Sequence, residues 1–313
     1  MDLADGVLRG DHLSISRAIS AVENGAPEAR AVIAAVAPHV GRAVRIGVTG
    51  PPGVGKSTFC DAVTGVLRPK GRRVGILSVD PSSAFTGGAL LGDRIRMTRV
   101  AEDPEVFMRS MATRGAFGGL SRATQDAADL LDAAGCQTIM IETVGVGQSE
   151  IEIARASDCV LVIVSPESGD GIQAMKAGLM EIADILVINK ADRVGADKME
   201  YDIRTAFDLG LKARRDTPIL LTEAFRSKGV PEAIDAIDAF VAARRADGRF
   251  DGRRRENMQD RLRRIVEFMI QRSLFDGNGA SRRLESLAKE VLERRTSSYD
   301  AAEALMKEAL GSK

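Results

Sequence analysis

A glycine-rich segment, GPPGVGKST at 50–58, holds the residues of this chain best suited to chemistry. It fits the pattern G-x-x-x-x-G-K-[ST] and follows an apolar run that predicts a strand. Backbone N–H groups of such a loop approach phosphate oxygens, and the helix N-terminus that follows adds favourable partial charge. We therefore predict that Lys56 reaches the β- and γ-phosphates, Ser57 binds Mg²⁺ and Thr58 contacts the α-phosphate. The other residues predicted to line the phosphates are Gly50, Pro51, Pro52, Gly53, Val54 and Gly55.

A second segment, INKAD at 188–192, predicts which base the nucleotide carries. Asn189, Lys190 and Asp192 fit the element N-K-x-D at the end of a predicted strand. The Asp192 carboxylate can accept two hydrogen bonds from guanine, a donor pair that adenine lacks, and the Lys190 stem can lie over the base. The next predicted strand ends in LTEA, whose backbone N–H groups can support the guanine O6; these belong to Thr222, Glu223 and Ala224.

Acidic residues at two further strand ends predict a metal site. Asp80 begins a long glycine-rich segment that contains Asp93 and, one turn later, Arg96. Asp80 is placed to ligate Mg²⁺ directly or through water, whereas Asp93 either joins the metal when the segment closes or caps a helix. Glu142 follows the apolar run QTIMI and is expected to hold Mg²⁺ or its water, with the Gly145 N–H facing the γ-phosphate.

The residue after Gly145 is Val146, where Ras-like GTPases carry the glutamine that orients the attacking water. Gln148 is nearby, but its spacing does not suit that role. We therefore predict slow intrinsic hydrolysis, accelerated when a partner orders a switch segment. A spacing of three also puts Asp170, Gln173 and Lys176 on one side of a helix, a pattern that by itself indicates only a solvated helix start.

The composition restricts the partners and the compartment. Net charge is zero, with 44 basic and 44 acidic residues, and aromatics make up 4%, so neither nucleic acid nor an anionic membrane is an expected partner. Cys60, Cys136 and Cys159 are scattered, which predicts buried reduced thiols, and His12 and His39 are too few for a metal store. The N-terminus lacks a signal peptide's apolar run and no window is long enough to span a bilayer, so we expect a cytoplasmic protein.

The elements that must position these motifs alternate along the middle of the chain. Residues 43–247 alternate short apolar runs with amphipathic segments, which predicts an α/β fold with an open, mostly parallel sheet. Ligands of such sheets bind at the carboxyl ends of the strands. Residues 1–42 predict a helical N-terminal element, and the charged stretch 244–257 predicts a linker. Helical residues 248–313 then either cap the core or form a dimerisation arm. The predicted strands are 43–49, 73–80, 106–111, 137–143, 159–165, 184–190 and 217–223.

Taken together, GPPGVGKST, VDPSS with GGALLGDRIRM, ETVGVGQSE and NKAD resemble the MeaB/ArgK/MMAA family of SIMIBI-class GTPases, and the resemblance covers nearly the whole chain. It implies a P-loop GTPase core with helical extensions, a homodimer, and the use of GTP, GDP and Mg²⁺. It also implies a chaperone that gates transfer of adenosylcobalamin from an adenosyltransferase to a B12-dependent acyl-CoA mutase and protects that mutase. The cofactor would be handled through these partners rather than stably bound.

The resemblance assigns roles to particular positions of this sequence. It implies that Asp170, Gln173 and Lys176 form a further switch with the signature D-x-x-Q-x-x-K. This favours a functional role for the three residues over a solvated helix start. Lys176 becomes our candidate for a residue that partner binding brings into the site. The predicted catalytic residues are Lys56, Asp93 and Lys176; the metal ligands are Ser57, Asp80, Asp93 and Glu142; and the switch residues also include Arg96 and Gln148.

Two other functions remain possible for the same motifs. A metal-ion insertase of the same superclass would need a Cys- or His-rich ligand cluster, which the scattered cysteines do not provide. A small-molecule kinase shares the phosphate loop but seldom needs guanine selectivity, so the N-K-x-D element disfavours it. The sequence also leaves the client open among methylmalonyl-CoA, isobutyryl-CoA and 2-hydroxyisobutyryl-CoA mutases.

Overall fold

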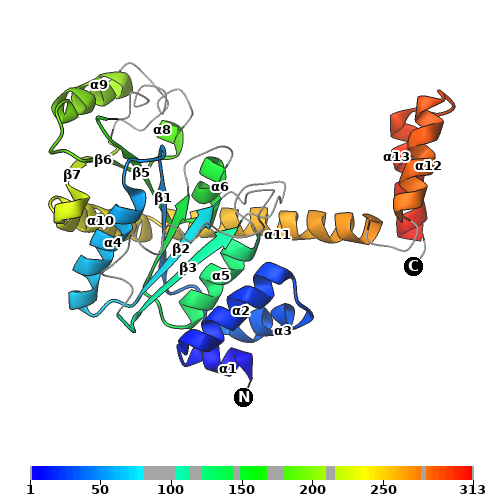
Figure 1. Ribbon diagram of the computed structural model, residues 1–313, viewed down its shortest axis with the longest axis horizontal. Coiled ribbons are helices and arrows are strands. Elements are labelled where there is room, and N and C mark those ends of the chain that lie inside the picture. The colour runs from blue at the N-terminus through cyan, green and yellow to red at the C-terminus, as the bar shows by residue number, and fades with distance from the viewer. Residues whose placement is uncertain are drawn as a thin grey trace. The chain divides into compact units, whose positions relative to one another are not determined.

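The computed structural model describes residues 2–80, 103–112, 122–143, 149–167, 179–208, 216–275 and 280–311. Its described strands form one sheet of seven in the order β3-β2-β4-β1-β5-β6-β7, and every neighbouring pair is parallel (Figure 1). Each of the seven predicted apolar runs forms one of these strands, so the α/β fold with a parallel sheet is confirmed. The strands are β1 Val44–Thr49, β2 Val74–Asp80, β3 Val106–Ala112, β4 Thr138–Thr143, β5 Cys159–Val164, β6 Ile185–Asn189 and β7 Ile219–Thr222.

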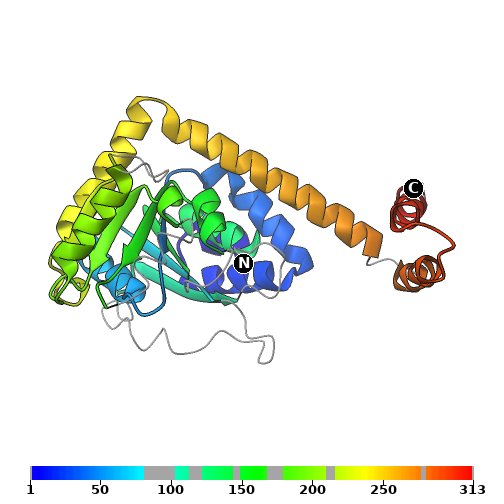
Figure 2. The ribbon, with the colours of Figure 1, turned by 90° about the horizontal axis from the view of Figure 1, so that it is seen from above.

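Helices cover both faces of the sheet (Figures 1 and 2). They are α4 Lys56–Leu67, α5 Arg122–Ala133, α6 Ser149–Ala156, α8 Leu179–Ile182, α9 Ala196–Asp208 and α10 Val230–Ala246, with short 3₁₀ turns η2 Arg68–Lys70 and η3 Ala224–Arg226. Apolar side chains of α4 and α10 pack on one face, and those of α5, α6, α8 and α9 pack on the other. The sheet is therefore buried from both sides, as its continuously apolar strands predict.

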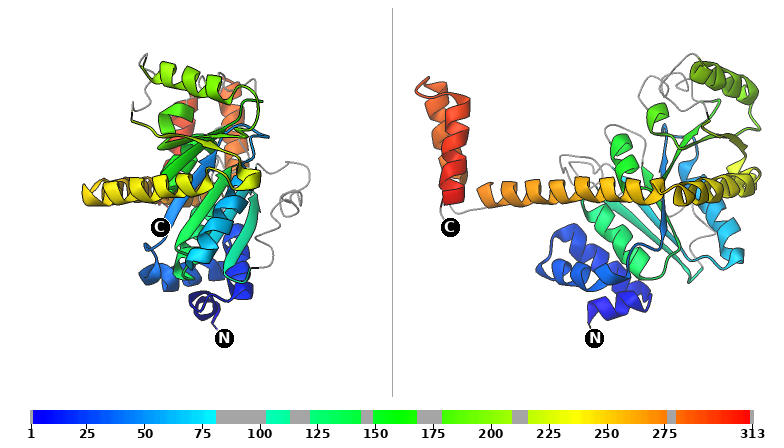
Figure 3. Two further views of the ribbon diagram at one scale, coloured as in Figure 1. Left: turned by 90° about the vertical axis from the view of Figure 1, so that its left-hand side faces the viewer. Right: turned by 180° about the vertical axis from the view of Figure 1, so that it is seen from behind.

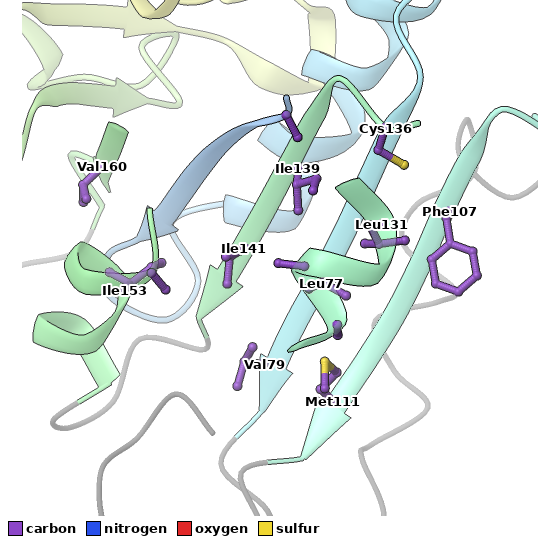
Figure 4. Packing of buried hydrophobic residues seen from close by; sticks show 14 of the residues in the cluster. Leu77, Val79, Phe107, Met111, Leu131, Cys136, Ile139, Ile141, Ile153 and Val160 are labelled. Atoms are coloured by element: carbon purple, nitrogen blue, oxygen red, sulfur yellow. The ribbon is translucent and has the colours of Figure 1, made fainter. Parts of the chain in front are cut away.

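Two hydrophobic cores result from the alternation of side chains along each strand. Leu77 and Val79 of β2 point into the core shared with α5, whereas Ile76 of the same strand belongs to the core shared with α4 and α10. Figure 4 shows the first of these cores, where Leu77 and Val79 lie near Leu131 of α5 and Ile141 of β4. The sheet therefore holds the strand ends in fixed register, which is what a site built on those ends needs.

The predicted N-terminal helical element is present and packs on the first core. It consists of α1 Leu3–Leu8, α2 His12–Asn24, α3 Pro27–Val36 and the 3₁₀ turn η1 Ala37–His39. Asp11 caps α2 by accepting a hydrogen bond from the Ser14 N–H at 2.8 Å, and Gly25 ends the helix in the left-handed conformation. Arg109 of β3 contacts Glu23 of α2 at 2.7 Å. The element is thus tied by charge to the edge strand of the sheet.

The chain divides into two compact units, Met1–Arg254 and Arg255–Lys313. The stretch predicted as a linker, 244–257, contains this boundary but is mostly helical, because α10 ends at Ala246 and α11 (Arg249–Phe275) begins three residues later. Its charged residues are not solvated: Arg253 pairs with Asp184 at 2.6 Å and Arg254 pairs with Asp158 at 2.7 Å. The first turns of α11 therefore belong to the unit that holds the sheet.

The second unit is helical, as predicted. In it α12 (Ala280–Leu292) and α13 (Ser298–Gly311) pack side by side around Leu287, Ala301 and Leu305 (Figure 3). Its part of α11 leaves a stripe of apolar side chains about half exposed in the single chain, namely Met258, Leu262, Val266 and Met269. Among the described residues, no helix has both the length and the apolar character needed to cross a membrane.

Candidate nucleotide-binding site

The predicted motifs share one edge of the sheet. Because all seven described strands run parallel, the segments that follow β1, β4, β6 and β7 emerge at the same side. Strand β1 lies between β4 and β5. The strands on its two sides connect in opposite directions along the sheet, away from the phosphate loop that follows β1. A crevice at such a point is where ligands bind in open α/β sheets.

Two glycines of the phosphate loop occupy positions that disfavour any side chain. Gly50 has φ of 141°, and a Cβ atom there would lie 1.9 Å from the carbonyl oxygen of Ile163. Gly55 has φ of 93°, and its Cβ would lie 2.6 Å from Nδ2 of Asn189. Gly55 is also the N-cap of α4 and offers no side-chain acceptor to the first-turn N–H groups. Those N–H groups and the helix dipole are therefore suited to a phosphate.

Lys56 points back into this loop. Its side chain is buried, and Nζ donates to the carbonyl oxygens of Gly50 and Pro51, both at 2.9 Å. The ammonium group is therefore held beside the loop backbone, where phosphate oxygens would compete with the two carbonyls for its protons. Val54 is buried, Pro52 and Gly53 are exposed, and Thr58 is half-buried on the first turn of α4.

Ser57 and Glu142 meet across two elements. The Ser57 hydroxyl donates to Oε1 of Glu142 at 2.6 Å, and the Ser78 hydroxyl of β2 lies 3.4 Å from Oε2 of the same carboxylate. The strand register produces this contact, because Glu142 of β4 is the partner of both Val48 in β1 and Ser78 in β2. Two residues predicted as metal ligands are thus brought together.

This donor set fits Mg²⁺. The ion prefers oxygen ligands and is usually held by one or two carboxylates together with substrate phosphates, rather than by an all-protein cage. The described residues contain no group of three His, Cys, Asp or Glu side chains that could hold a metal. Asp80 is the last residue of β2, next to β4, as the metal prediction requires.

The three cysteine thiols are buried, and burial raises the pKa of each. Cys60 lies on α4 in the core, where burial and then the charge of Glu142 raise the pKa of its thiol. Burial also raises the pKa of Cys136, to about 12, and that of Cys159. All three cysteines are free and buried, so the prediction of buried reduced thiols is confirmed.

Asn189 connects the phosphate loop to the base side of the site. It is 3% exposed, and its Nδ2 donates to the Val54 carbonyl at 2.9 Å. Its Oδ1 accepts from the Thr222 hydroxyl at 3.1 Å and from the Ala224 N–H at 3.0 Å. The Asn of the N-K-x-D element thus holds the ends of β6 and β7 against the phosphate loop, and a base contact would be additional to this role.

The other two residues of the element face solvent. The Asp192 side chain is 41% exposed, so its carboxylate is open to a ligand. Lys190 donates from Nζ to Glu167 Oε2 at 2.9 Å, and Arg193 Nε lies 3.2 Å from the other oxygen of Glu167. The hydrogen bond from Lys190 holds the pKa of the Glu167 carboxyl below its ordinary value.

The turn after β7 is braced within the chain. The Glu223 N–H donates to the Lys228 carbonyl at 2.9 Å, and the Ala224 N–H is bound to Asn189. The Glu223 carboxylate accepts from Lys228 at 2.6 Å, which holds the pKa of that carboxyl below its ordinary value. Thr222, Glu223 and Ala224 therefore lie where predicted, while the support of guanine O6 by their N–H groups stays a prediction.

Several predicted residues lie outside the described parts of the chain. They are Asp93, Arg96, Gly145, Val146, Gln148, Asp170, Gln173 and Lys176. Their roles stay predictions, and so does the choice between metal ligand and helix cap for Asp93.

Comparison with known proteins identifies the family. A family model described as "Methylmalonyl Co-A mutase-associated GTPase MeaB" matches residues 15–278. The chain belongs to the MeaB family of GTPases. A protein of Pyrococcus abyssi is 42% identical over 314 residues, which cover 99% of this chain and 97% of that one. GTPase ArgK of Escherichia coli is 36% identical over 87% of this chain and 86% of its own length.

Structural comparison agrees with the family. The crystal structure of an LAO/AO transport system kinase superposes with a TM-score of 0.72 and 28% identity, covering 97% of this chain and 95% of that one. With a GTPase family model, GTPase relatives and the phosphate loop in place, the chain is a P-loop GTPase that hydrolyses GTP. The predicted family and enzyme class are confirmed.

Two features of the site were missed by reading the sequence. One is the pair of hydrogen bonds that Asn189 makes to Val54, 135 residues away in the chain, and to Thr222, 33 residues away. The other is Glu167, whose position two residues after the apolar run CVLVIVS was the available signal. Both depend on contacts between separate strand ends, which only the assembled sheet shows.

Proposed function

We propose that this protein is a GTP-hydrolysing chaperone that gates adenosylcobalamin delivery to a B12-dependent acyl-CoA mutase and protects that mutase. The observation that carries this proposal is the match of residues 15–278 to a family described as associated with methylmalonyl-CoA mutase. A mouse relative, "Methylmalonic aciduria type A homolog, mitochondrial", is 37% identical over 67% of this chain. The proposed clients are methylmalonyl-CoA, isobutyryl-CoA or 2-hydroxyisobutyryl-CoA mutase, with a cobalamin adenosyltransferase as the second partner.

The proposed binding mode uses both sides of the carboxyl edge. Asp192 accepts hydrogen bonds from guanine, and the Lys190 stem lies over the base. The first-turn N–H groups of α4 and the Lys56 ammonium take the phosphates in place of the carbonyl oxygens that Lys56 now contacts. Ser57 and Glu142 would hold Mg²⁺, joined by Asp80 and, when its segment closes, by Asp93. When bound, Mg²⁺ supplies neutralisation of charge on the β- and γ-phosphates.

The proposed hydrolysis is slow until a partner acts. The apolar Val146 follows Gly145 in the slot where Ras-like enzymes hold water with a glutamine, so this chain has to position water by other groups. We assign the sensing of nucleotide state to Gly145, Arg96 and Gln148, and the response to the partner to Asp170, Gln173 and Lys176. Lys176 is the group that partner binding would bring to the phosphates.

Residues 248–313 serve in this proposal as a dimerisation arm. The apolar stripe on α11 supports it, because Leu262 and Val266 are each more than half exposed in the single chain. Replacing both with glutamate in the full chain is expected to convert the dimer to a monomer in sedimentation analysis. An unchanged dimer would remove the arm from the proposal. The proposed location is the cytoplasm, and zero net charge argues against nucleic-acid or membrane partners.

The proposal is tested by phosphate release from GTP with and without a cobalamin-loaded acyl-CoA mutase. We expect a low basal rate, stimulation by the client mutase, no need for a phosphate acceptor, and little activity with ATP. Lys176→Ala is expected to bind GTP normally and lose the stimulation. Phosphate transfer to a small molecule would instead favour a kinase, and stimulation by none of the three mutases would remove the chaperone role.

Gating of the cofactor is tested separately by absorbance. Transfer of adenosylcobalamin from the adenosyltransferase to the mutase is followed with GTP and with a non-hydrolysable analogue. We expect transfer with GTP and a block with the analogue. Equal transfer with both nucleotides would contradict gating, even if the mutase stimulated hydrolysis.

A further inference from the structure

Glu167 holds two cations beside the proposed base site. Its Oε2 accepts from Lys190 Nζ at 2.9 Å, and its Oε1 lies 3.2 Å from Arg193 Nε. Arg193 Nε also lies 3.8 Å from Oδ2 of Asp192, the carboxylate proposed to read guanine. Glu167 comes three residues after β5, whereas the other three residues follow β6. One carboxylate therefore joins two neighbouring strand ends through the residues that would contact the base.

The turn that contains Lys190 fixes the backbone conformation of this residue independently of its side chain. Lys190 has φ of 57°, a left-handed conformation that a non-glycine residue adopts at a cost. The turn holds it there, because the Arg193 N–H donates to the Lys190 carbonyl at 2.9 Å and the Ala191 N–H donates to the Thr222 carbonyl at 3.0 Å. With Glu167 bound to Nζ, the Lys190 stem is tethered at both ends.

Tethering the stem matters because lysine is among the most flexible side chains. Ordering a free lysine against a ligand costs side-chain entropy, and a side chain already held in place avoids that cost at binding. The lysine stem can cover an apolar surface while its ammonium stays in contact with charge and water. Glu167 thus presents the methylene groups of Lys190 as a preformed platform for a flat base.

Glu167 also competes for Arg193. Among the described contacts, the Arg193 guanidinium lies near two carboxylates, Glu167 and Asp192. Without Glu167 it would be left with Asp192, whose Oδ2 already lies 3.8 Å from Arg193 Nε. An Arg193–Asp192 pair would occupy the oxygens that guanine needs. Glu167 therefore keeps the base-reading carboxylate open, and the hydrogen bond from Lys190 lowers the pKa of Glu167, which favours its charged form.

We propose that Glu167 is a positioning residue for guanine nucleotides, which fixes the Lys190 stem as the platform for the base and draws Arg193 away from Asp192. This inference rests on the proposed guanine site and adds a residue to it. It acts on the base, which GTP and GDP share, and not on the γ-phosphate.

The test is titration of the full-length protein with GDP and with a non-hydrolysable GTP analogue. Exposed ion pairs have modest strength, so Glu167→Ala is expected to weaken both nucleotides about two- to fivefold and equally. Glu167→Gln keeps an acceptor for Lys190 and is expected to lose less. In GTP turnover, KM rises and kcat at saturation stays unchanged. The matched control is Glu200→Gln, which breaks the exposed Glu200–Arg204 pair on α9 and should change neither nucleotide.

Double variants separate positioning from general disturbance. On a Lys190→Met background, where no ammonium needs holding, Glu167→Ala should lose most of its effect. Adding Arg193→Ala to Glu167→Ala should restore part of the affinity, because the competitor for Asp192 is gone. Thermal unfolding of each variant without nucleotide checks that the fold is intact.

Three results would overturn the inference in distinguishable ways. If Glu167→Ala leaves GDP affinity unchanged while Asp192→Asn weakens it, the guanine site stands and Glu167 has no part in it. If Glu167→Ala weakens the GTP analogue but not GDP, the residue acts on the γ-phosphate side instead. If neither Glu167→Ala nor Asp192→Asn changes affinity, the proposed guanine site itself fails.

Discussion

The two ends of the same sheet use charge in opposite ways. At the amino ends of the strands, Asp158 and Asp184 are buried and neutralised by arginines, with Asp158 4% and Asp184 8% exposed in their side chains. Each also accepts a backbone N–H, from Arg45 at 2.9 Å and from Val160 at 3.0 Å. At the carboxyl ends, Asp192 is 41% exposed. At the amino ends these buried, paired carboxylates hold the structure, whereas the exposed carboxylate of Asp192 is left for a ligand.

Asp132 extends the structural pattern at the amino ends. Its carboxylate accepts the N–H groups of Gly41, Arg42 and Ala43 at 2.8 to 3.1 Å and lies 3.6 Å from Arg45. These bonds fix the chain just before β1 enters the sheet. The loop that leaves β1 at the other end is held by glycine geometry and backbone contacts instead. One end of β1 is therefore rigid through ion pairs, and the other is shaped to receive phosphate.

The largest effect should come from breaking the buried network at the amino ends. Asp184→Ala removes the buried carboxylate that pairs with the buried Arg244 and the half-buried Arg253, and we expect the free energy of unfolding to fall by about 3–5 kcal/mol. Urea unfolding without nucleotide measures it. Glu200→Ala, in an exposed pair, is the control and should change stability by less than about 1 kcal/mol. A loss as small as the control's would mean that this end is not the structural one.

The next largest effect should appear at the carboxyl end and in activity alone. Lys56→Ala removes the cation that faces the phosphate loop, and we expect kcat/KM for GTP to fall on the order of a hundred- to a thousandfold. Phosphate release measures the rate, and urea unfolding should show little change relative to the loss from Asp184→Ala. The control is Lys307→Ala, an exposed lysine of α13. A wild-type rate for Lys56→Ala would place the chemistry elsewhere.

A smaller effect should follow alkaline pH at the amino end. Cys136 precedes β4, and burial raises the pKa of its thiol from 9.0 to about 12. A raised folded-state pKa means that the stability is fully present below pH 9 and is lost as pH rises from 9 towards 12, since the unfolded thiol ionises first. The slope should be steeper in the wild type than in Cys136→Ala by up to about 1.4 kcal/mol per pH unit, because the buried Cys60 and Cys159 thiols contribute in both proteins. Equal slopes in the two proteins would show that this thiol is not buried.

How far the sequence could predict this molecule depends on the range of the contacts. The strands and the phosphate loop follow from local patterns, because seven apolar runs and one spaced glycine motif each act within a few residues. The N-K-x-D element could be assigned to guanine because it lies at the end of a predicted strand. These predictions needed no knowledge of which strands are neighbours.

The differences from prediction and the omissions all involve distant partners. The arginines near 250 looked like a solvated linker, but Arg254 binds Asp158, 96 residues earlier in the chain. Asn189 donates a hydrogen bond to Val54, 135 residues earlier in the chain, and Glu167 accepts one from Lys190 across two strand ends. Residue types alone do not fix such pairs, because the strand order decides which ends meet.

The carboxyl end of this sheet is proposed to read guanine through Asp192. The most direct measurement is the affinity of Asp192→Asn for guanosine and xanthosine diphosphates, compared with the wild type. We predict that GDP affinity falls about ten- to a hundredfold, since a charge-assisted pair of hydrogen bonds is lost, while the affinity for the xanthine nucleotide rises. Unchanged GDP affinity with no gain for xanthine would contradict the claim.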